Sequence, residues 1–399
     1  MRLDWFSPLP PARTDVAQYT ARVVGELVRS TEVALWTAQA RWDAGLARVA
    51  PVRRFRAQRT EVEAGGLAVY HIGNNREFHA GIWSVARRVP GVVVLHDVRL
   101  FEFVFQCYRH GAGGLAGFAA VMERFYGEAG RRDAGVFWEH GLSVRYMMEH
   151  YPLFPAVIEG ARGVVVHTRA GASLVAGALA APVEYLPLPY PAAPLAETPD
   201  ERRRRYTDAA VYRLVMFGFL NRNRRLEAVL EALAAHPRRE RFRLDVFGEL
   251  WDRELIAGLV RKLGLEAAVQ VHGFVPEERL DAALGQAHLA LNLRNPSMGE
   301  ASGTQLRAWR HALPVAVTRT GWYAELPENT VRWVRPDHER DEMVETLSDL
   351  LARPLDYMQV GEAGRALLES DHSPRRYATL IDQFCRKCWE RDSRAARAG

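Results

Sequence analysis

The chain alternates between short apolar runs and longer segments in which apolar residues recur every three or four positions. Short apolar runs are typical of strands buried in a parallel sheet, and the longer period is typical of helices that cover such a sheet. The first half of the chain is expected to contain strands at Arg2–Phe6, Glu32–Thr37, Leu67–Ile72, Gly91–His96, Gly163–His167 and Val183–Leu186. A first helix is expected over Val16–Arg29. This alternation predicts an α/β fold.

A proline-rich segment, Pro187–Pro194, interrupts the pattern and is followed by the charged run Thr198–Arg205. Proline lacks the N–H that a helix interior or a central strand needs, so neither element continues through it. We interpret residues 187–210 as a connection between two domains. The boundaries expected from this are 1–190 for the first domain and 207–373 for the second.

A second α/β series follows the connection. Its expected strands are Arg213–Phe219, Phe242–Phe247, Val269–Gly273, His288–Leu293, Pro314–Thr318 and Val331–Val334. After the first of these strands, Leu226, Val229, Leu230 and Leu233 share one face of a helix. The last predicted helix, about residues 374–391, carries an apolar face that includes Tyr377 and Ile381.

Length and composition agree with two globular domains. The chain has 399 residues, of which 48% are hydrophobic and 25% charged. Its three cysteines are too few for a disulfide framework, which favours a reducing cytoplasm. Cys385 and Cys388 have no second ligand pair for zinc and are expected to be thiols on one helix face. The sequence contains no apolar run long enough to span a bilayer and no apolar signal core near its start.

The net charge of +5 suits an anionic ligand or surface. No nucleic-acid recognition motif accompanies this charge, so we expect no nucleic-acid partner. Arg53, Arg54, Arg56 and Arg59 surround Phe55. Basic residues beside an aromatic residue can hold a protein against an anionic bilayer, which predicts peripheral contact with the inner face of the membrane. The alternative is a solvated basic loop.

Two groups of polar residues follow strands in the first half, where ligands bind in open parallel sheets. His96 and Asp97 end the strand Gly91–His96; His96 can donate to a substrate hydroxyl, and Asp97 can orient it. Asp97 as a helix cap and His96 as a core residue is the alternative. Asn74, Asn75 and His79 follow the strand Leu67–Ile72 and can bind an acceptor, or Asn74 and Asn75 can simply form a turn.

Two further groups follow strands in the second half. Gly218–Arg225 joins a strand to a helix and contains Arg222, Arg224 and Arg225, where backbone N–H groups and positive charge would suit a diphosphate. Asn295–Leu306 opens another helix, and Ser302 to Gln305 would direct N–H groups at phosphate while Glu300 accepts bonds from sugar hydroxyls. The alternatives are a solvated basic loop and an ordinary helix start.

A different reading rests on Gly111–Ala116, which matches the dinucleotide pattern G-x-G-x-x-[GA], with Asp133 about twenty residues later. Such a site needs a strand directly before the glycines. The preceding segment Val98–His110 is predicted to be a helix. An NAD-dependent enzyme is therefore kept only as a remote alternative.

Taken together and in this order, the motifs resemble retaining glycosyltransferases of family 4, which have the GT-B fold of two Rossmann-like domains facing a central cleft. The resemblance extends over most of the chain. The motifs are similar to those of a subgroup from bacterial polysaccharide and glycoconjugate biosynthesis. The motifs that carry it are Ser7–Pro11 with Val16–Tyr19, Tyr70–Asn75 with His79, Val94–Asp97, Asn295–Gly303, Pro314–Val317 and Gly321–Pro327. It implies transfer of a sugar from a nucleotide diphosphate donor to an acceptor, without a metal ion or other cofactor.

The resemblance also implies roles for individual residues. His96 and Asp97 would lie near the reacting carbon, and Glu300 would hold the transferred sugar. The residues implied for the donor are Gly218, Arg222, Arg224, Phe274, Val275, Ser302, Gly303, Thr304, Gln305 and Arg307. The residues implied for the acceptor are Asp15, Asn74, Asn75 and His79. In this family the acceptor attacks the front face of the donor sugar, and the leaving diphosphate helps to deprotonate the acceptor. Electrostatic stabilisation of that diphosphate is then the main catalytic contribution.

Three positions depart from the family pattern. Thr14-Asp15 replaces the usual Ser-Gly, and Phe219 stands where an arginine is usual after Gly218. The second glutamate of the paired motif is missing: Ala308 has its spacing, and Arg307 precedes it. These departures motivate an alternative, a catalytically inactive GT-B protein that binds a sugar nucleotide or a partner. The donor base, the sugar, the acceptor and the oligomeric state do not follow from the sequence.

Overall fold

The computed structural model describes residues 1–57, 65–111 and 113–398. It divides into two compact units. Unit 1 comprises Met1–Pro189, the short segment Met298–Ala301 and the residues from Pro374 onward. Unit 2 comprises Tyr190–Ser297 and Ser302–Ser373.

Unit 1 is built on a seven-stranded sheet in which every pair of neighbours is parallel. Its strands are β1 (Arg2–Phe6), β2 (Glu32–Thr37), β3 (Val52–Arg54), β4 (Gly66–Ile72), β5 (Val92–Leu95), β6 (Gly163–Val166) and β7 (Val183–Tyr185). The spatial order is β3-β2-β1-β4-β5-β6-β7. The chain reverses its direction of travel across the sheet between β1 and β4, which is where open parallel sheets bind ligands.

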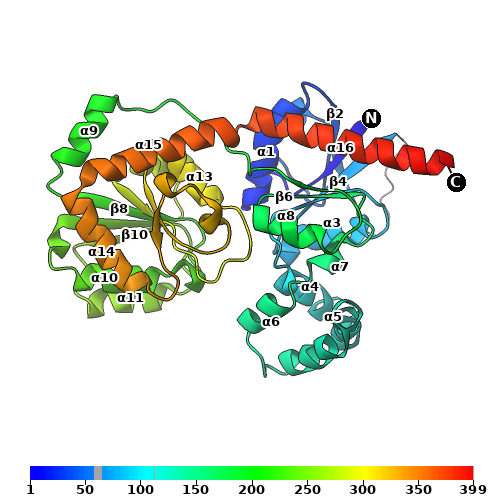
Figure 1. Ribbon diagram of the computed structural model, residues 1–399, viewed down its shortest axis with the longest axis horizontal. Coiled ribbons are helices and arrows are strands. Elements are labelled where there is room, and N and C mark those ends of the chain that lie inside the picture. Colours follow the sequence, from blue (N-terminus) through cyan, green and yellow to red (C-terminus); the bar gives the residue numbers. More distant parts are fainter. Residues whose placement is uncertain (58–64, 112, 399) are drawn as a thin grey trace. The chain divides into compact units, whose positions relative to one another are not determined.

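Successive residues of each strand enter different cores on the two faces of this sheet. Val92 and Val94 pack with α1 (Asp15–Leu27) and α16 (Pro374–Ala398), whereas Val93 and Leu95 pack with the helices of the opposite face. The other helices of unit 1 are α2 (Ala44–Val49), α3 (Arg76–Ala86), α4 (Phe101–Arg109), α5 (Gly114–Trp138), α6 (Val144–His150), α7 (Phe154–Ile158) and α8 (Arg169–Ala176). Helices α4 to α7 form one insertion between β5 and β6, coloured cyan to green in Figure 1.

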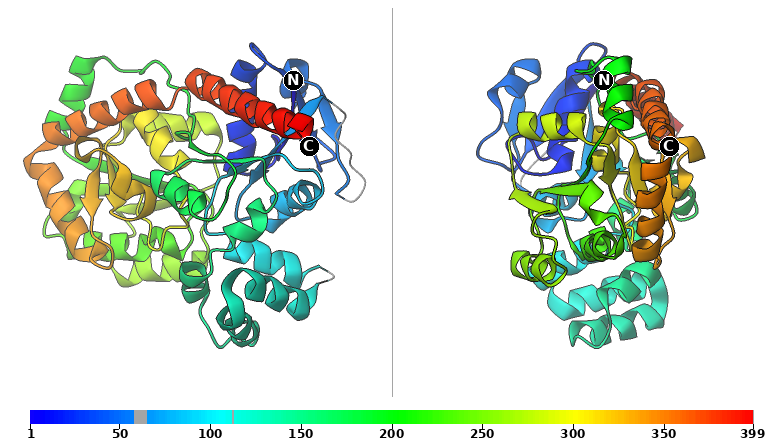
Figure 2. Two further views of the ribbon diagram at one scale, coloured as in Figure 1. Left: turned by 45° about the vertical axis from the view of Figure 1, so that its right-hand side comes forward. Right: turned by 90° about the vertical axis from the view of Figure 1, so that its left-hand side faces the viewer.

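The last helix, α16, runs beside the first helix, α1, as Figure 1 and the left view of Figure 2 show. The Tyr19 and Tyr377 hydroxyls are 2.6 Å apart, and the Thr31 hydroxyl donates to Asp382 over 2.6 Å. Phe384, Cys385 and Cys388 are buried in the same core, so the two thiols are packing groups. Burial raises the pKa of Cys385, which keeps that thiol protonated.

Unit 2 has a six-stranded parallel sheet in the order β10-β9-β8-β11-β12-β13. The strands are β8 (Tyr212–Phe217), β9 (Phe242–Phe247), β10 (Val269–Gly273), β11 (Leu289–Leu291), β12 (Val315–Thr318) and β13 (Arg332–Val334). The helices are α9 (Pro199–Thr207), α10 (Leu226–Ala235), α11 (Arg253–Lys262), α12 (Glu277–Gln286), α13 (Gly303–Arg310), α14 (Glu339–Ala352) and α15 (Pro354–Asp371). The expected α/β architecture with two parallel-sheet units is therefore confirmed.

Two local expectations differ from the structure. The short strand β3 was not predicted, because its three residues include Arg53 and Arg54 and show no apolar run. Within the expected connection 187–210, residues Pro199–Thr207 form the helix α9, which belongs to unit 2. Thr198 and Glu201 form a capping box at its start, and Tyr206 is buried in the core of unit 2.

None of the helices that the structure describes is long and apolar enough to cross a membrane.

Candidate functional site

His96 directly follows β5 at the carboxyl edge of the unit 1 sheet. It is one of three histidines at the ends of three neighbouring strands: His71 lies in β4, His96 after β5 and His167 after β6. The His71 Nδ1 and His96 Nε2 atoms are 3.1 Å apart, and the His96 and His167 ring centroids are 5.2 Å apart. Burial, and then the neighbouring imidazoles, hold the pKa of His96 well below its usual value. This edge therefore presents neutral imidazole.

Asp97 joins two strand ends and does not cap a helix. Its Oδ2 atom accepts a hydrogen bond from the Asn74 backbone N–H over 2.8 Å, which ties the loop after β4 to the loop after β5. The Asn74 Oδ1 atom in turn accepts from the Phe103 N–H, and Asn75 is the N-cap of α3. Much of the polar capacity of Asp97 and Asn74 thus shapes the edge itself.

The two remaining residues expected at the acceptor side are differently exposed. His79 is buried, and its Nδ1 atom donates to the His71 carbonyl over 3.0 Å. Burial lowers the pKa of His79 to about 4, so the ring is neutral near pH 7. Asp15 is exposed in the first turn of α1, after the N-cap Thr14. In this structure Asp15 is open to a ligand, whereas His79 supports β4 from within.

In unit 2, three neighbouring strands each meet a glycine with positive φ at the carboxyl edge. These are Gly218 after β8 (φ 105°), Gly248 after β9 (φ 114°) and Gly273 at the end of β10 (φ 68°). A Cβ atom on Gly248 would lie 2.0 Å from the Gly218 carbonyl oxygen, so the two backbones cross in contact. Only glycine permits this combination of conformation and approach.

The arginines after Gly218 do not share one environment. Arg222 is exposed and lies over the Trp251 ring, 4.2 Å from its centroid. Arg224 is 2% exposed, and its Nη2 atom donates to the Phe217 carbonyl over 3.2 Å. Arg225 bonds to Glu339 over 3.2 Å. The positive charge expected here is present, but Arg224 lies beneath the loop surface.

The loop after β11 ends at the start of α13. Ser302 is the N-cap, and its hydroxyl accepts from the Gln305 N–H over 3.2 Å. The buried Asn292 side chain donates to Gln305 over 3.1 Å, so Gln305 is held within the protein. Gly303 and Thr304 occupy the first turn, and a Cβ atom on Gly218 would lie 3.4 Å from the Thr304 hydroxyl. The helix start therefore lies beside the Gly218 turn, at the point where the strand order reverses.

Arg307 points to acidic side chains of its own unit. Its Nη2 atom lies 2.8 Å from both Asp281 and Glu277 on α12. Burial alone would raise the pKa of Asp281, but hydrogen bonding from His311 and Arg307 lowers it to about 2. Ala308, at the spacing of the missing glutamate, is buried. This part of α13 therefore presents an ion-pair network in place of a lone carboxylate.

The last predicted residues lie on loops. Phe274, after β10, is 64% exposed, and Val275 beside it is half-buried. An aromatic face is therefore open next to the carboxyl edge formed by Gly218, Gly248 and Gly273, which we call the glycine edge. Glu300 is half-buried, and its Oε2 atom accepts from the Met298 N–H over 2.7 Å. The segment Met298–Ala301 groups with unit 1.

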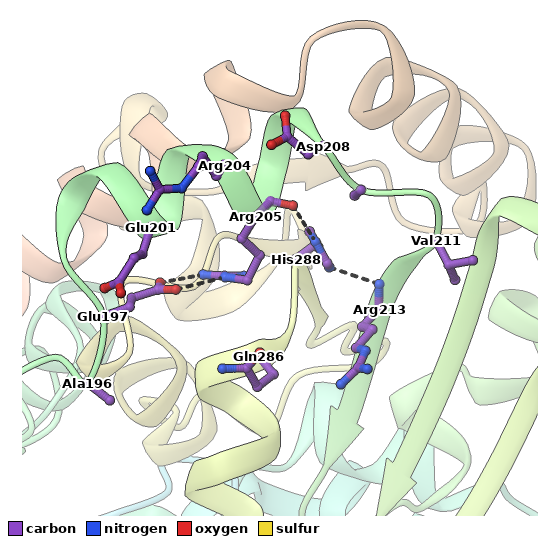
Figure 3. Close-up of a pocket in the computed structure, with 11 residues that line it drawn as sticks. Ala196, Glu197, Glu201, Arg204, Arg205, Asp208, Val211, Arg213, Gln286 and His288 are labelled. Carbon is purple, nitrogen blue, oxygen red and sulfur yellow. Dashed lines mark hydrogen bonds and ion pairs between the residues drawn. The ribbon is translucent and has the colours of Figure 1, made fainter.

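An open pocket of about 650 Å³ lies at the opposite, amino-terminal edge of the unit 2 sheet (Figure 3). Its inner wall is already paired: Arg205 bonds to Glu197 over 2.7 Å, and His288 bridges the Arg213 N–H and the Arg205 carbonyl. Burial lowers the pKa of His288 to about 4. Its position and these internal bonds separate this pocket from the glycine edge.

Three other expectations can be placed. Gly111 and Gly113 follow the helix α4 and not a strand, which removes the context that a dinucleotide site needs. Among residues 1–57, 65–111 and 113–398, no group of three or more His, Cys, Asp or Glu side chains could hold a metal ion. Of the basic segment, Arg53 and Arg54 lie in β3 and Phe55 is buried, whereas Arg59 lies outside the described residues.

Sequence reasoning missed several residues that shape these edges, among them His71, Gly248 and Asn292. A signal for His71 and His167 was present, because β4, β5 and β6 each carry a histidine at or beside the carboxyl end on the same sheet face. Gly248 could have been found as a glycine directly after a buried strand, like Gly218. Asn292 is hidden in an apolar run, and nothing local marks its bond to Gln305.

Comparisons with known proteins extend these observations. Residues 199–367, less than half of the chain, match the family model of glycosyl transferases group 1. A comparison with curated proteins found no match.

Solved structures resemble the chain over nearly its whole length. Anabaena HepE in complex with UDP-glucose has 13% identity and a TM-score of 0.63, covering 97% of this chain and all of that one. Sucrose-phosphate synthase from Thermosynechococcus elongatus has 16% identity and a TM-score of 0.66, covering 98% and 99%. WaaG, a glycosyltransferase involved in lipopolysaccharide biosynthesis, has 16% identity and a TM-score of 0.59, covering 96% and 99%. The chain thus has the GT-B fold of glycosyltransferases, and residues 199–367 carry its similarity to group 1.

Proposed function

We propose that the protein is a retaining glycosyltransferase of family 4 that uses a nucleoside diphosphate sugar and needs no metal ion. The observation that carries the proposal is the glycine edge of unit 2, where the Gly218 turn, the Thr304 hydroxyl and the start of α13 converge. Backbone N–H groups at a helix start and nearby arginine charge suit a diphosphate. The match over residues 199–367 supports the same function.

In the proposed reaction, the bond between the anomeric carbon and the diphosphate oxygen breaks as the acceptor oxygen attacks the same face of the sugar. The acceptor proton passes to the leaving diphosphate. The diphosphate charge is stabilised by Gly218, Arg222, Arg224, Gly303 and Thr304, with Arg224 acting from beneath the loop. Phe274 and Val275 lie along the base. His96 and Glu300 hold the sugar, with Asp97 fixing the loops around His96.

A UDP-sugar is the first donor to test, because the structure of HepE contains UDP-glucose and the chain shares its fold. The acceptor is a glycan, a lipid-linked glycan or a small molecule. We place the protein in the cytoplasm at the inner face of the membrane, where Arg53 to Arg59 would contact anionic lipid.

One experiment tests the core of this proposal. Thermal shift with UDP-, GDP- and ADP-sugars and with NAD(H) identifies the ligand, and the best donor then enters a transfer and hydrolysis assay with and without EDTA. We expect stabilisation by one sugar nucleotide, turnover that survives EDTA, and a product that keeps the donor anomeric configuration in NMR spectra. Stabilisation by NAD(H) alone, metal-dependent turnover or an inverted product would each contradict the corresponding part.

A second candidate, a sugar-nucleotide-binding protein without transferase activity, is favoured by one observation. Arg307 and Ala308 stand where the family has its second glutamate, so this stretch of α13 offers no carboxylate to a ribose, and Arg307 itself is paired with Asp281 and Glu277. Tight binding of a sugar nucleotide with neither hydrolysis nor transfer, across glycan and lipid acceptors, would support this candidate over the enzyme.

The membrane part has its own test. Co-sedimentation with vesicles of neutral lipid and of neutral plus anionic lipid should show binding only to the anionic vesicles, because each basic residue near such a surface contributes about 1 kcal/mol. Equal, negligible binding to both would leave a freely diffusing acceptor as the better assignment.

A further inference from the structure

The imidazoles of His71 and His96 form a hydrogen-bonded pair across two neighbouring strands. The His71 Nδ1 and His96 Nε2 atoms are 3.1 Å apart. His71 is fully buried, whereas His96 is half-buried. The Nδ1 atom of His96 makes no hydrogen bond with the described residues. It is also absent from their fully buried atoms without a partner, so part of its surface is accessible.

Aromatic rings fix the position of both imidazoles. Trp5 lies against His71 with ring centroids 4.2 Å apart. Tyr19 contacts His71 at 5.2 Å and meets His96 edge-on at 4.9 Å. Neither imidazole can rotate freely within these contacts, so the choice of which nitrogen carries the proton is set by hydrogen bonding.

Both imidazoles of the pair are neutral near pH 7. Burial, and then the adjacent His167 and His79, lowers the pKa of His71, and the same causes act on His96. Tyr19 is hydrogen-bonded to Tyr377 on α16, and burial raises the pKa of Tyr19. Asp97, the nearest carboxylate in sequence, accepts a bond from the Asn74 N–H. Each ring of the pair therefore carries a single proton near pH 7.

Two proton arrangements are then possible, and they differ at the buried Nε2 atom of His71. That atom has no hydrogen-bond partner among the described residues. If His96 donated through Nε2, His71 would accept at Nδ1 and its own proton would sit on the partnerless Nε2, a buried N–H donor without an acceptor. Such orphaned donors are rarer than unsatisfied acceptors. The other arrangement, donation from His71 Nδ1 to His96 Nε2, avoids it.

We propose that His71 is a positioning residue that fixes His96 as the Nδ1–H tautomer, so that His96 offers a hydrogen-bond donor and not a base at the carboxyl edge of unit 1. The inference rests on the proposed function for its consequence: His96 would donate to an oxygen of the bound sugar, and the acceptor proton would leave by another route. The tautomer itself does not depend on the reaction.

The tautomer is measured by long-range nitrogen–proton correlation NMR on protein labelled with ¹⁵N-histidine, with His96→Gln used only to assign the signals. We expect a protonated Nδ1 and a bare Nε2 at His96. His71→Phe should shift His96 toward the Nε2–H form, and His71→Asn should restore the wild-type pattern, because its amide nitrogen occupies the position of Nδ1. A protonated Nε2 at His96 in the wild-type protein, or His96 signals unchanged in His71→Phe, would overturn the proposal.

The kinetic arm uses the same variants with the donor identified by thermal shift. We expect His71→Phe to lower kcat by about 10-fold or more with little change in the Kd for the nucleoside diphosphate, as when the partner that orients a functional histidine is lost. His71→Asn should recover most of that loss. His236→Asn, which removes another buried histidine bonded to Ser348 in unit 2, is the control for general destabilisation and should leave the His96 signals unchanged. Absence of any transfer would remove the proposed function, while the NMR result would still decide the tautomer.

Discussion

The two sheets end in chemically different edges. In unit 1 the edge is made by His71, His96 and His167, and burial holds the pKa of His71 and of His96 well below the usual value. In unit 2 it is made by glycine turns, a helix start and arginine side chains. Both sheets reverse their strand order, between β1 and β4 in unit 1 and between β8 and β11 in unit 2. The same topology therefore carries two kinds of chemistry at its carboxyl edge.

The difference follows from what each side chain does on burial. Burial lowers the pKa of a histidine, so that the ring is neutral at physiological pH, whereas arginine stays charged in proteins. One edge can therefore supply neutral, directional hydrogen bonds, and the other can supply positive charge. A sugar needs the first, and a diphosphate needs the second. Variants at the two edges should accordingly change different measured quantities.

The largest expected effect breaks the glycine edge itself. Gly248→Ala should destabilise unit 2 by about 3–4 kcal/mol, because the residue has φ 114° and its Cβ would lie 2.0 Å from the Gly218 carbonyl oxygen. Urea unfolding followed by hydrogen exchange measures the change and places it in one unit. Gly258→Ala, in α11 with open space around the Cβ, is the control and should be stabilising by about 0.5–1 kcal/mol. Equal stabilities for the two variants would mean that the crossing is not tight.

The next effect is confined to turnover. His96→Ala should lower kcat by ~10²-fold or more while leaving the Kd for the nucleoside diphosphate unchanged, because the proposed contact with the sugar would strengthen only in the transition state. Initial rates and calorimetry on the same preparations separate the two quantities. His110→Ala, exposed at the end of α4, provides the control. A raised Kd for the nucleoside diphosphate with an unchanged kcat would assign His96 to nucleotide binding. The two edges would then not differ in function.

The third effect is confined to affinity. Arg224→Ala should weaken nucleoside diphosphate binding by ~1.5–3 kcal/mol, the range for a hydrogen bond to a charged group. Arg225→Ala, its neighbour already paired with Glu339, should change the affinity far less. Because Arg224 is buried against the Phe217 carbonyl, thermal unfolding of both variants must accompany the titrations. Unchanged affinity for UDP, GDP and ADP would remove Arg224 from the site and leave Arg222 as the nearest charge.

The smallest effect concerns pH and the neutral edge. The pKa of His79 is about 4 in the folded protein, below the usual value of about 6.5, so the unfolded chain binds the proton first. Stability is complete above about pH 6.5 and is lost as the pH falls toward 4. Between pH 7.5 and 5 this histidine should contribute about 1–2 kcal/mol to the loss in urea unfolding.

His79→Asn provides the control for that measurement, because its amide can still donate to the His71 carbonyl but does not titrate. The variant should flatten the pH dependence by the same amount. A slope identical to that of the wild-type protein would show that folding does not lower the pKa of His79, contrary to its burial.

Much of this architecture could be predicted from the sequence, because buried parallel strands are nearly continuous apolar runs. Every strand of unit 2, and all but β3 in unit 1, was expected within one or two residues. The misses have physical causes. β3 pairs at the sheet edge through backbone hydrogen bonds that need no apolar side chains, and α9 depends on a cap and one buried tyrosine inside a charged run.

The candidate site was predictable in position and less so in detail. Strand ends and loops gave His96, Gly218 and the α13 start, since a motif after a strand lies at the carboxyl edge wherever the strand is placed. Partner choice was not predictable: that Arg307 turns to Asp281, or that His71 bonds to His96, depends on which elements become neighbours in space. Such pairings are properties of the folded chain and not of any local segment.

The packing of α16 against α1 has a consequence for biosynthesis. The apolar side chains that complete this face of unit 1, among them Tyr377, Ile381 and Phe384, leave the ribosome after all of unit 2 has been made. Until then this apolar sheet face of the nascent protein is covered only in part, by α1 and its neighbours, while unit 2 already has every residue that it needs. We therefore expect the second unit to mature first on the ribosome, and the first unit to depend on chaperones for as long as translation of the last helix is delayed.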